Sequence, residues 1–265
     1  MSCCPELSWP YLESSHNEEG TKKEVDGVSF YQVGEGKGNK KGLIICPDVW
    51  GWGGGRTRNT ADMLANAGFN VIVLKLLAPP MDATKCTDGD GIPPDFIPSP
   101  ETFPTLVTYL KTLPYEKISP SLFIAVKTME SDGVTSIGVI GACWGAWVLA
   151  RFLADSNLPA SVKAGVSWHP SIQLEEPVFG GDPVSLLKKA QRPMKLLPTV
   201  NDPEGYKEGG NFYEAIKSVQ PNSEVLLFDE MSHGFTTRGD MSDAKVKRDV
   251  ELAMTTTVEY FQKFC

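Results

Sequence analysis

Short apolar runs alternate with amphipathic segments along most of the chain, which predicts strands that alternate with helices. The runs expected to form strands are 28–33, 43–46, 70–77, 137–140, 162–168, 194–200 and 224–228. The segments expected to form helices are 58–67, 102–112, 119–130, 146–153, 212–219 and 243–264. Residues 70–77 are apolar almost throughout, as in a strand buried on both faces of a parallel sheet. The pattern therefore predicts an α/β fold with a doubly wound, mostly parallel sheet flanked by helices.

The chain shows neither an internal repeat nor a linker that would divide it. We therefore expect a single domain over residues 26–265, preceded by an N-terminal arm over residues 1–25. Residues 78–99 are rich in Pro, Gly and Asp, so no regular element is expected there. Together with the two helices that follow, this segment should form a lid or pocket wall over the carboxyl edge of the sheet.

Composition narrows the class of partner. A formal net charge of −8 argues against nucleic acid or an anionic membrane as the main partner. No apolar stretch approaches the length of a membrane span, and the first residues do not resemble a secretory signal. Six cysteines without disulfide-like regularity favour reduced thiols in a cytoplasmic protein. Cys3-Cys4 could hold a soft metal, but no second pair lies at suitable spacing, and a tail without metal is favoured.

The segment Gly141-Ala142-Cys143-Trp144-Gly145 lies between an expected strand and an expected helix. A strand that turns sharply into a helix holds the apical residue in a strained conformation and needs small neighbours two positions away. The apical residue is Cys143, and the helix N-terminus that follows favours its thiolate. This pattern indicates a nucleophile, although a buried turn with an incidental cysteine gives the same five residues.

A cysteine nucleophile requires a base and a group that orients the base. The chain has three histidines: His16, His169 and His233. Asp202 ends an expected strand and precedes His233, so Cys143, Asp202 and His233 follow the chain order of an α/β-hydrolase triad. His169 would break that order. Asp229 and Glu230 are alternative acids, although they lie on or beside the strand that leads to His233.

An acyl-transfer site also needs donors for the oxyanion. We expect one from the backbone amide of Trp144, directly after the nucleophile, and one from the amide of Val49, in the loop after strand 43–46. Glycines within residues 51–55 could instead cradle a phosphate. The sequence lacks the G-x-x-x-x-G-K-S/T motif, so no nucleotide cofactor is expected.

With this elbow, Asp202 and the sequence Ser232-His233-Gly234-Phe235, the chain resembles the dienelactone hydrolase (carboxymethylenebutenolidase) family from about residue 26 onward. The resemblance implies a single-domain α/β-hydrolase, active as a carboxylic-ester hydrolase without metal or organic cofactor. It also implies Cys143 as nucleophile, Asp202 as acid and His233 as base. The arm that carries Cys3-Cys4 resembles that of eukaryotic members.

The resemblance also bears on substrate contacts. Residues 47–51 match a loop in which bacterial members carry a glutamate that bonds the resting thiol until substrate displaces it. Here the residue is Asp48, one methylene shorter, and a turn-capping role is the alternative. Bacterial members bind a substrate carboxylate with arginines, and Arg238 is a candidate for one of them. Trp50, in the same loop as Asp48, and His169 complete the expected substrate contacts.

These observations predict a cysteine hydrolase of small esters or lactones that forms an acyl-cysteine intermediate. Three alternatives use the same triad: a thioesterase, an acyltransferase and a peptidase. A fourth is a hydrolase-fold protein that binds a small ligand without catalysis. A small molecule is the expected partner, and the sequence is compatible with a monomer or a homodimer.

Overall fold

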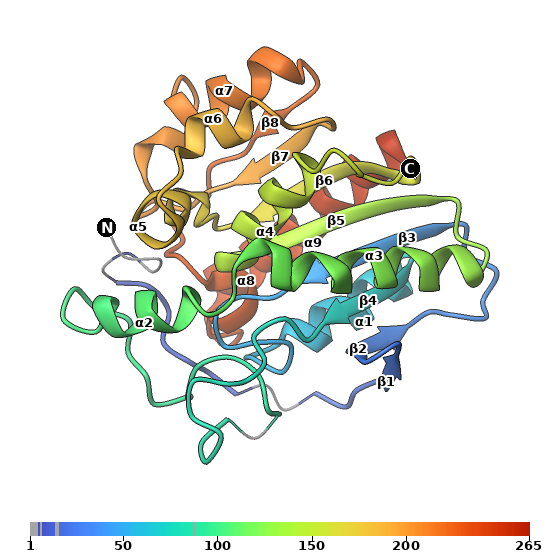
Figure 1. The fold of residues 1–265 in the computed structure, drawn as a ribbon, viewed down its shortest axis with the longest axis horizontal. Helices are drawn as coiled ribbons and strands as arrows, with labels where there is room; N and C mark the ends of the chain where they lie inside the picture. The colour runs from blue at the N-terminus through green and yellow to red at the C-terminus, as the bar shows by residue number, and fades with distance from the viewer. Residues whose placement is uncertain (1–4, 6, 14–15, 87) are drawn as a thin grey trace.

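The computed structural model describes residues 5, 7–13, 16–86 and 88–265. An eight-stranded sheet forms its centre, in the order β1-β2-β4-β3-β5-β6-β7-β8 (Figure 1). β2 pairs antiparallel with both β1 and β4, and all other pairs are parallel. The strands are β1 Thr21–Val25, β2 Val28–Val33, β3 Lys41–Cys46, β4 Asn70–Leu74, β5 Ser136–Ala142, β6 Val162–Trp168, β7 Met194–Leu197 and β8 Glu224–Val225. This sheet confirms the predicted α/β class.

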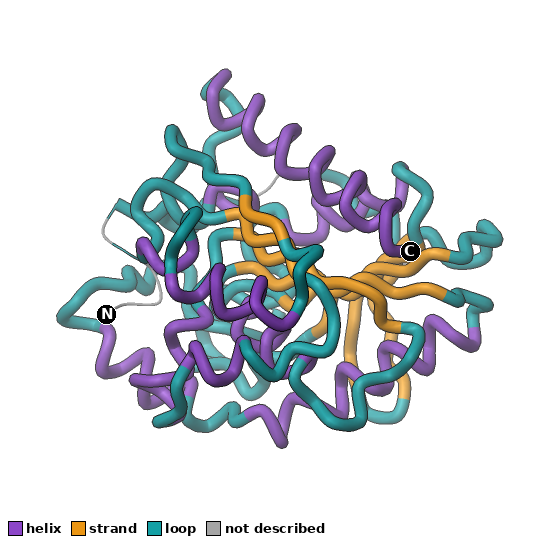
Figure 2. The backbone as a smooth tube through the Cα atoms, turned by 90° about the horizontal axis from the view of Figure 1, so that it is seen from above, coloured by secondary structure: helices purple, strands orange, loops and turns teal. Residues whose placement is uncertain are grey.

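Helices cover both faces of the sheet (Figure 2). The longer ones are α1 Thr57–Asn66, α2 Phe103–Leu110, α3 Tyr115–Ser131, α4 Trp144–Leu153, α7 Asn211–Val219 and α9 Ala244–Phe264. The short ones are η1 Ile172–Leu174, α5 Glu175–Phe179, α6 Pro183–Leu187, η2 Glu204–Tyr206 and α8 Phe235–Arg238.

The alternation of side chains along the strands builds two hydrophobic layers. In β3, Ile44 and Cys46 pack with the buried faces of α3 and α4, whereas Leu43 and Ile45 pack with α1 and α9. Both layers consist mainly of buried aliphatic and aromatic side chains, because a central parallel strand is covered on each face. The central strands are therefore rigid, and the loops at their carboxyl ends are held in fixed positions.

Several expected boundaries are wrong for identifiable reasons. Strand 70–77 ends at Leu74, and the amide of Leu77 instead donates to Asp90 Oδ1 at 2.6 Å. Strand 194–200 ends at Leu197, because Pro198 has no amide hydrogen for the ladder. Strand 224–228 is regular only over β8, although its backbone still follows β7 through a bridge between Thr199 and Phe228.

Two further differences concern helices and the arm. Helix 119–130 is longer than expected, because α3 already begins at Tyr115 and contains Pro120. Thr21–Val25, expected at the end of the arm, form strand β1 and pair with β2. The division into an arm and a domain stays a prediction.

Residues 88–102 contain no helix or strand, as expected for the segment before α2. None of the helices in the described ranges is both long and apolar enough to cross a membrane.

Candidate active site

The turn between β5 and α4 has the strained geometry that the sequence predicts. Cys143 has φ 53° and ψ −118°, a region that non-glycine residues rarely occupy. A Cβ on Gly141 would lie 2.3 Å from the carbonyl oxygen of Gly145, and one on Gly145 would lie 2.1 Å from that of Cys46. Gly141 is therefore required for the close approach of α4 to its own strand β5, and Gly145 for the close approach of α4 to the end of β3. Three backbone hydrogen bonds hold Cys143 itself, to Trp168, Ala146 and Ser171.

His233 and Asp202 form a buried pair near this turn. Nδ1 of His233 lies 2.6 Å from Oδ1 of Asp202, and both side chains are wholly buried. The other carboxylate oxygen of Asp202 accepts from the amide and the hydroxyl of Thr199, each at 2.8 Å. The side chain of Asn201 accepts from the backbone amide of His233 at 2.8 Å. Asp202 is thus fixed by its own turn, and the imidazole is fixed by Asp202.

The charges around His233 favour its protonated form. Burial by itself lowers the pKa of His233, but the negative charges of Asp202 and Cys143 outweigh it and raise the pKa to about 9. Cys143 is therefore close enough to the imidazole for its charge to act on it. The hydroxyl of Ser171 also donates a hydrogen bond to the sulfur of Cys143, with Oγ and Sγ 3.6 Å apart. Cys143, Asp202 and His233 come together at the carboxyl edge of the sheet.

Asp48 forms a second buried charged pair, with Arg238, and both side chains are wholly buried. Oδ2 of Asp48 also accepts from the hydroxyl of Thr237 at 2.8 Å, and Oδ1 from the amide of Trp50 at 3.0 Å. Burial raises the pKa of Asp48, Arg238 opposes this effect, and the charge of Cys143 adds to it. The guanidinium carbon of Arg238 lies 4.1 Å from the centre of the Trp50 ring. Arg238 thus faces Asp48 and Trp50 rather than an open surface.

His169 lies beside His233, with 4.8 Å between the ring centres. It has φ 34°, and its Nε2 lies 2.6 Å from the hydroxyl of Thr236. Burial and the positive charge of His233 hold the pKa of His169 well below its usual value. A neutral imidazole therefore packs against the protonated one.

The expected oxyanion donors lie at the two loops that meet here. Trp144 is the first residue of α4, so its amide has no carbonyl partner within that helix. Val49 is wholly buried in the loop after β3, and its carbonyl accepts from the amide of Ile92 at 2.9 Å. Their roles stay predictions.

Sequence reasoning missed several contacts of this site. The backbone of Trp9 forms two hydrogen bonds to residues of the site. Its amide donates to the backbone carbonyl of His233 at 2.9 Å, and its carbonyl accepts from Nε of Arg238 at 3.1 Å. Ser171 and Thr237 were also missed, although each lies within four residues of a predicted site histidine. Cys3-Cys4 lies outside the described residues.

Within the described ranges, no group of three or more His, Cys, Asp or Glu side chains is arranged to hold a metal ion.

A model of the dienelactone hydrolase family matches residues 28–265. The chain belongs to this family. The chain is 24% identical to the hydrolase TropI of Talaromyces stipitatus over 100% of this chain and 98% of that protein. It is 25% identical to the carboxymethylenebutenolidase homologue of Rattus norvegicus over 92% of this chain and 91% of the relative. As a dienelactone hydrolase family member it is a hydrolase of the esterase type.

Solved structures agree on the α/β-hydrolase fold. A putative dienelactone hydrolase from Klebsiella pneumoniae superposes with a TM-score of 0.67 at 17% identity, over 92% of this chain and 98% of that chain. The esterase Pf2001 of Pyrococcus furiosus gives 0.60 at 18% identity, over 97% and 99% of the two chains. These likenesses confirm the predicted single α/β-hydrolase fold of the family.

Breaking the Asp48–Arg238 pair gives a first testable prediction. Arg238→Leu leaves the Asp48 carboxylate buried without its cation, so we expect unfolding to cost about 3–5 kcal/mol less than in the wild type. Urea denaturation measures this difference. The control is Arg248→Leu, whose side chain is 56% exposed beside Glu230 and should cost less than about 1 kcal/mol. Equal losses in the two variants would show that the buried pair does not stabilise the fold.

Proposed function

We propose that this hydrolase cleaves small carboxylic esters or lactones through an acyl-cysteine intermediate. The observation that carries the proposal is the strained turn at Cys143 beside the buried His233–Asp202 pair. In this assignment Cys143 is the nucleophile, His233 the general base and acid, and Asp202 the group that orients His233.

In the first step the thiolate sulfur of Cys143 forms a bond to the carbonyl carbon of the substrate. The π electrons move to the oxygen, and the backbone amides of Trp144 and Val49 stabilise the resulting oxyanion. When the intermediate collapses, the carbon–oxygen bond to the leaving group breaks. Protonated His233 donates its proton to the departing alkoxide, which leaves as an alcohol.

In the second step water attacks the thioester. His233 accepts one proton from the water, and the new carbon–oxygen bond forms as the carbon–sulfur bond breaks. The carboxylic acid leaves, and Cys143 is again a thiolate beside protonated His233. A thiolate is expelled from the tetrahedral intermediate more easily than an alkoxide or an amine anion, so the first step goes forward best when the substrate has a good leaving group. Activated esters and lactones therefore suit this nucleophile better than peptides.

The Asp48–Arg238 pair bears on the charge of the substrate. Arg238 is already neutralised by Asp48 and stacked on Trp50. Because Asp48 already balances the charge of Arg238, a substrate carboxylate would gain less from binding this guanidinium than from binding an unpaired one. We therefore favour uncharged esters and lactones over a lactone that carries a carboxylate. We place neutral His169 at the substrate side of His233, where it limits the orientations of that imidazole.

The proposal also keeps three expectations from the sequence. We propose that the protein acts in the cytoplasm, as a monomer or homodimer, and that the reaction needs neither a metal nor an organic cofactor.

Intact-mass spectrometry tests the intermediate directly. Mixing the protein with a small panel of activated esters and lactones and quenching in acid should give a mass increase equal to one acyl group. Peptide mapping should place that group on Cys143. Adding amines or thiols as acceptors distinguishes hydrolysis from acyl transfer, because a transferase would give the amide or thioester product in preference to the acid. An acyl group on any other residue would contradict the assignment of Cys143.

A further inference from the structure

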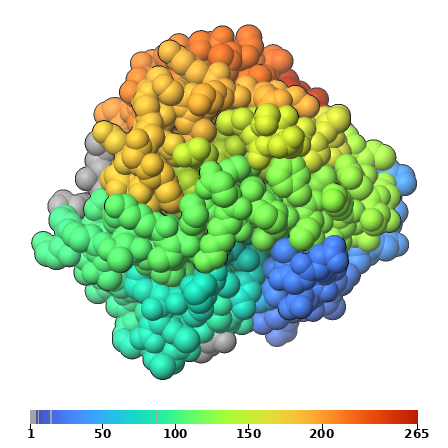
Figure 3. Space-filling model, viewed as in Figure 1, coloured from blue at the N-terminus to red at the C-terminus, as the bar shows by residue number. Residues whose placement is uncertain are grey.

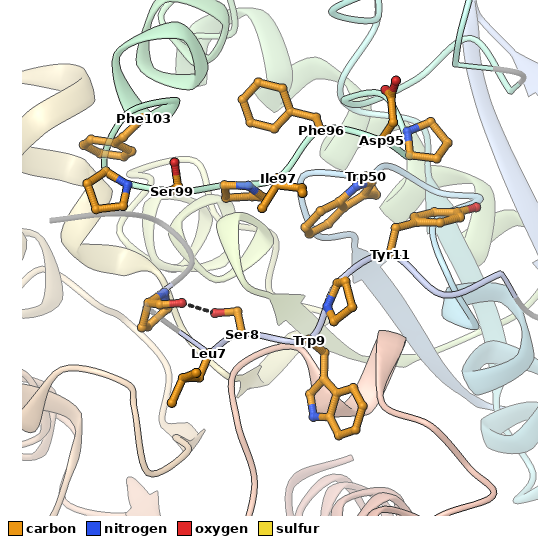
Figure 4. A pocket seen from close by; sticks show the side chains of 15 residues that line it. Leu7, Ser8, Trp9, Tyr11, Trp50, Asp95, Phe96, Ile97, Ser99 and Phe103 are labelled. Carbon is orange, nitrogen blue, oxygen red and sulfur yellow. Dashed lines mark hydrogen bonds between the residues drawn. The ribbon is translucent and has the colours of Figure 1, made fainter.

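A cavity of about 950 Å³ lies between the N-terminal segment 7–11 and the loop 94–103 (Figure 4). We call residues 7–11 the strap. The walls of the cavity are mainly apolar and include Leu7, Tyr11, Trp50, Phe96, Ile97 and Phe103. The loop that forms the upper wall leads into α2, which lies on the surface next to α5 (Figure 3). The volume is within the range of about 300–1,000 Å³ that is usual for small-molecule sites.

The cavity adjoins the active site but does not reach the sulfur. Cys143 and His233 are wholly buried, and neither lines the cavity. Trp50 is one point of contact between the cavity and the site, because it lines the cavity and its ring packs on Arg238. Trp9 is the second point of contact, because it lines the cavity while its backbone bonds His233 and Arg238. The strap therefore contacts the cavity and the surroundings of the site at the same time.

The chemistry of the walls defines the ligand. Among the described residues that line the cavity, none is basic. Asp95 is the acidic one, and its carboxylate is 66% exposed and paired with Lys85. The indole nitrogens of Trp9 and Trp50 are both buried without a hydrogen-bond partner among the described residues. The cavity thus suits an uncharged, mainly aromatic or aliphatic group with few hydrogen-bond acceptors.

We propose that this cavity binds an uncharged apolar group of the substrate, and that the strap moves aside to join the cavity to Cys143. The proposal rests on the ester hydrolysis proposed above and specifies its substrate class. It gives the strap two functions: it forms one wall of the binding site, and it excludes solvent from the thiol while the site is empty.

Charge placed at Ile97 tests the binding site. Ile97 is 72% exposed at the rim of the cavity, so a polar replacement should preserve the fold. We compare three p-nitrophenyl esters: the acetate, the octanoate, and the monoester of octanedioic acid, which has the same chain length with a terminal carboxylate. The wild type should prefer the octanoate over both others at least about tenfold in kcat/KM. That preference corresponds to about 1.4 kcal/mol or more.

Ile97→Asp should lower the octanoate-to-acetate ratio about tenfold, and Ile97→Lys should raise the ratio of the charged monoester to the octanoate by a similar factor. The matched controls, Leu252→Asp and Leu252→Lys, place the same charges on an exposed position of α9 and should leave both ratios unchanged. Ratios within twofold of the wild type in both Ile97 variants would overturn the proposal.

Calorimetric binding to Cys143→Ala separates the two proposals, because it does not depend on turnover. The octanoate ester should bind this variant at least about tenfold more tightly than the charged monoester, and adding Ile97→Lys should abolish that preference. If hydrolysis proves independent of Cys143, the proposed function is wrong, whereas this binding result still decides on the cavity. Absence of the preference would refute the cavity assignment even if Cys143 is the nucleophile.

Alkylation tests the strap. Trp9→Ala keeps the backbone bonds but removes the indole that packs the strap against the hydrophobic core, and it should increase the rate of iodoacetamide labelling of Cys143 at least tenfold, as measured by peptide mass. Leu252→Ala is the control and should label at the wild-type rate. A rate in Trp9→Ala equal to that of the wild type would show that the strap does not restrict access to the thiol.

Discussion

Replacement of Cys143 by alanine is expected to lower kcat for p-nitrophenyl acetate at least about 10⁴-fold, because the acyl group then has no nucleophile to receive it. The fold should persist, since the thiol removed is small. The unfolding free energy should fall by about 1–2 kcal/mol. Steady-state kinetics and urea denaturation of the same preparation measure both effects.

Cys46→Ala is the matched control. Cys46 is also a wholly buried thiol that ends β3, and because burial raises its pKa we expect it to stay a neutral thiol. We expect this variant to keep the wild-type kcat. Cys143→Ser gives a further comparison, because its hydroxyl must lose a proton to His233 before attack and should react more slowly than the thiolate. More than a tenth of the wild-type kcat in Cys143→Ala would show that another group forms the bond to the substrate.

Replacement of Asp202 by asparagine is expected to lower kcat by about 10⁴, as in a serine protease with the equivalent change. The physical reason lies in the pKa of His233. Burial disfavours the imidazolium, and the charge of Asp202 is the largest effect that raises the pKa to about 9. Without that charge the pKa of His233 should fall, so the ring is mainly neutral at pH 7 and no longer stabilises the thiolate.

NMR titration of the histidine rings measures this change. In the wild type His233 should remain protonated up to about pH 9, and in Asp202→Asn it should lose its proton at lower pH. Asp229→Asn tests the neighbouring acid that the sequence left open and should change neither kcat nor the titration. An unchanged His233 pKa in Asp202→Asn would remove Asp202 from the triad.

The fold could be predicted from the sequence because its central strands carry continuous apolar runs between turn-forming residues. The turn at Cys143 was equally predictable, since only glycine tolerates the contacts found at positions 141 and 145. The chain order of Cys143, Asp202 and His233 then selected the histidine and the acid. Each of these signals is local, or depends only on the order of the strands.

The features that the sequence did not reveal depend on contacts between distant segments. Asp48 and Arg238 lie 190 residues apart, and neither has a local pattern that identifies a buried partner. Strand β1 was missed because its residues are mostly exposed and polar, so the apolar alternation of a half-buried strand is absent. The docking of the strap through backbone groups of Trp9 leaves no trace in side-chain periodicity. Such contacts require the three-dimensional structure.

The backbone bonds of Trp9 join the start of the chain to a loop that is made near its end. During synthesis the strap has no docking site until residues 233–238 have emerged and folded, so it is among the last segments to settle. Its described attachment relies on few hydrogen bonds, and such segments open at a lower free-energy cost than a central sheet. On warming, the thiol should therefore become reactive at temperatures at which the sheet is still intact.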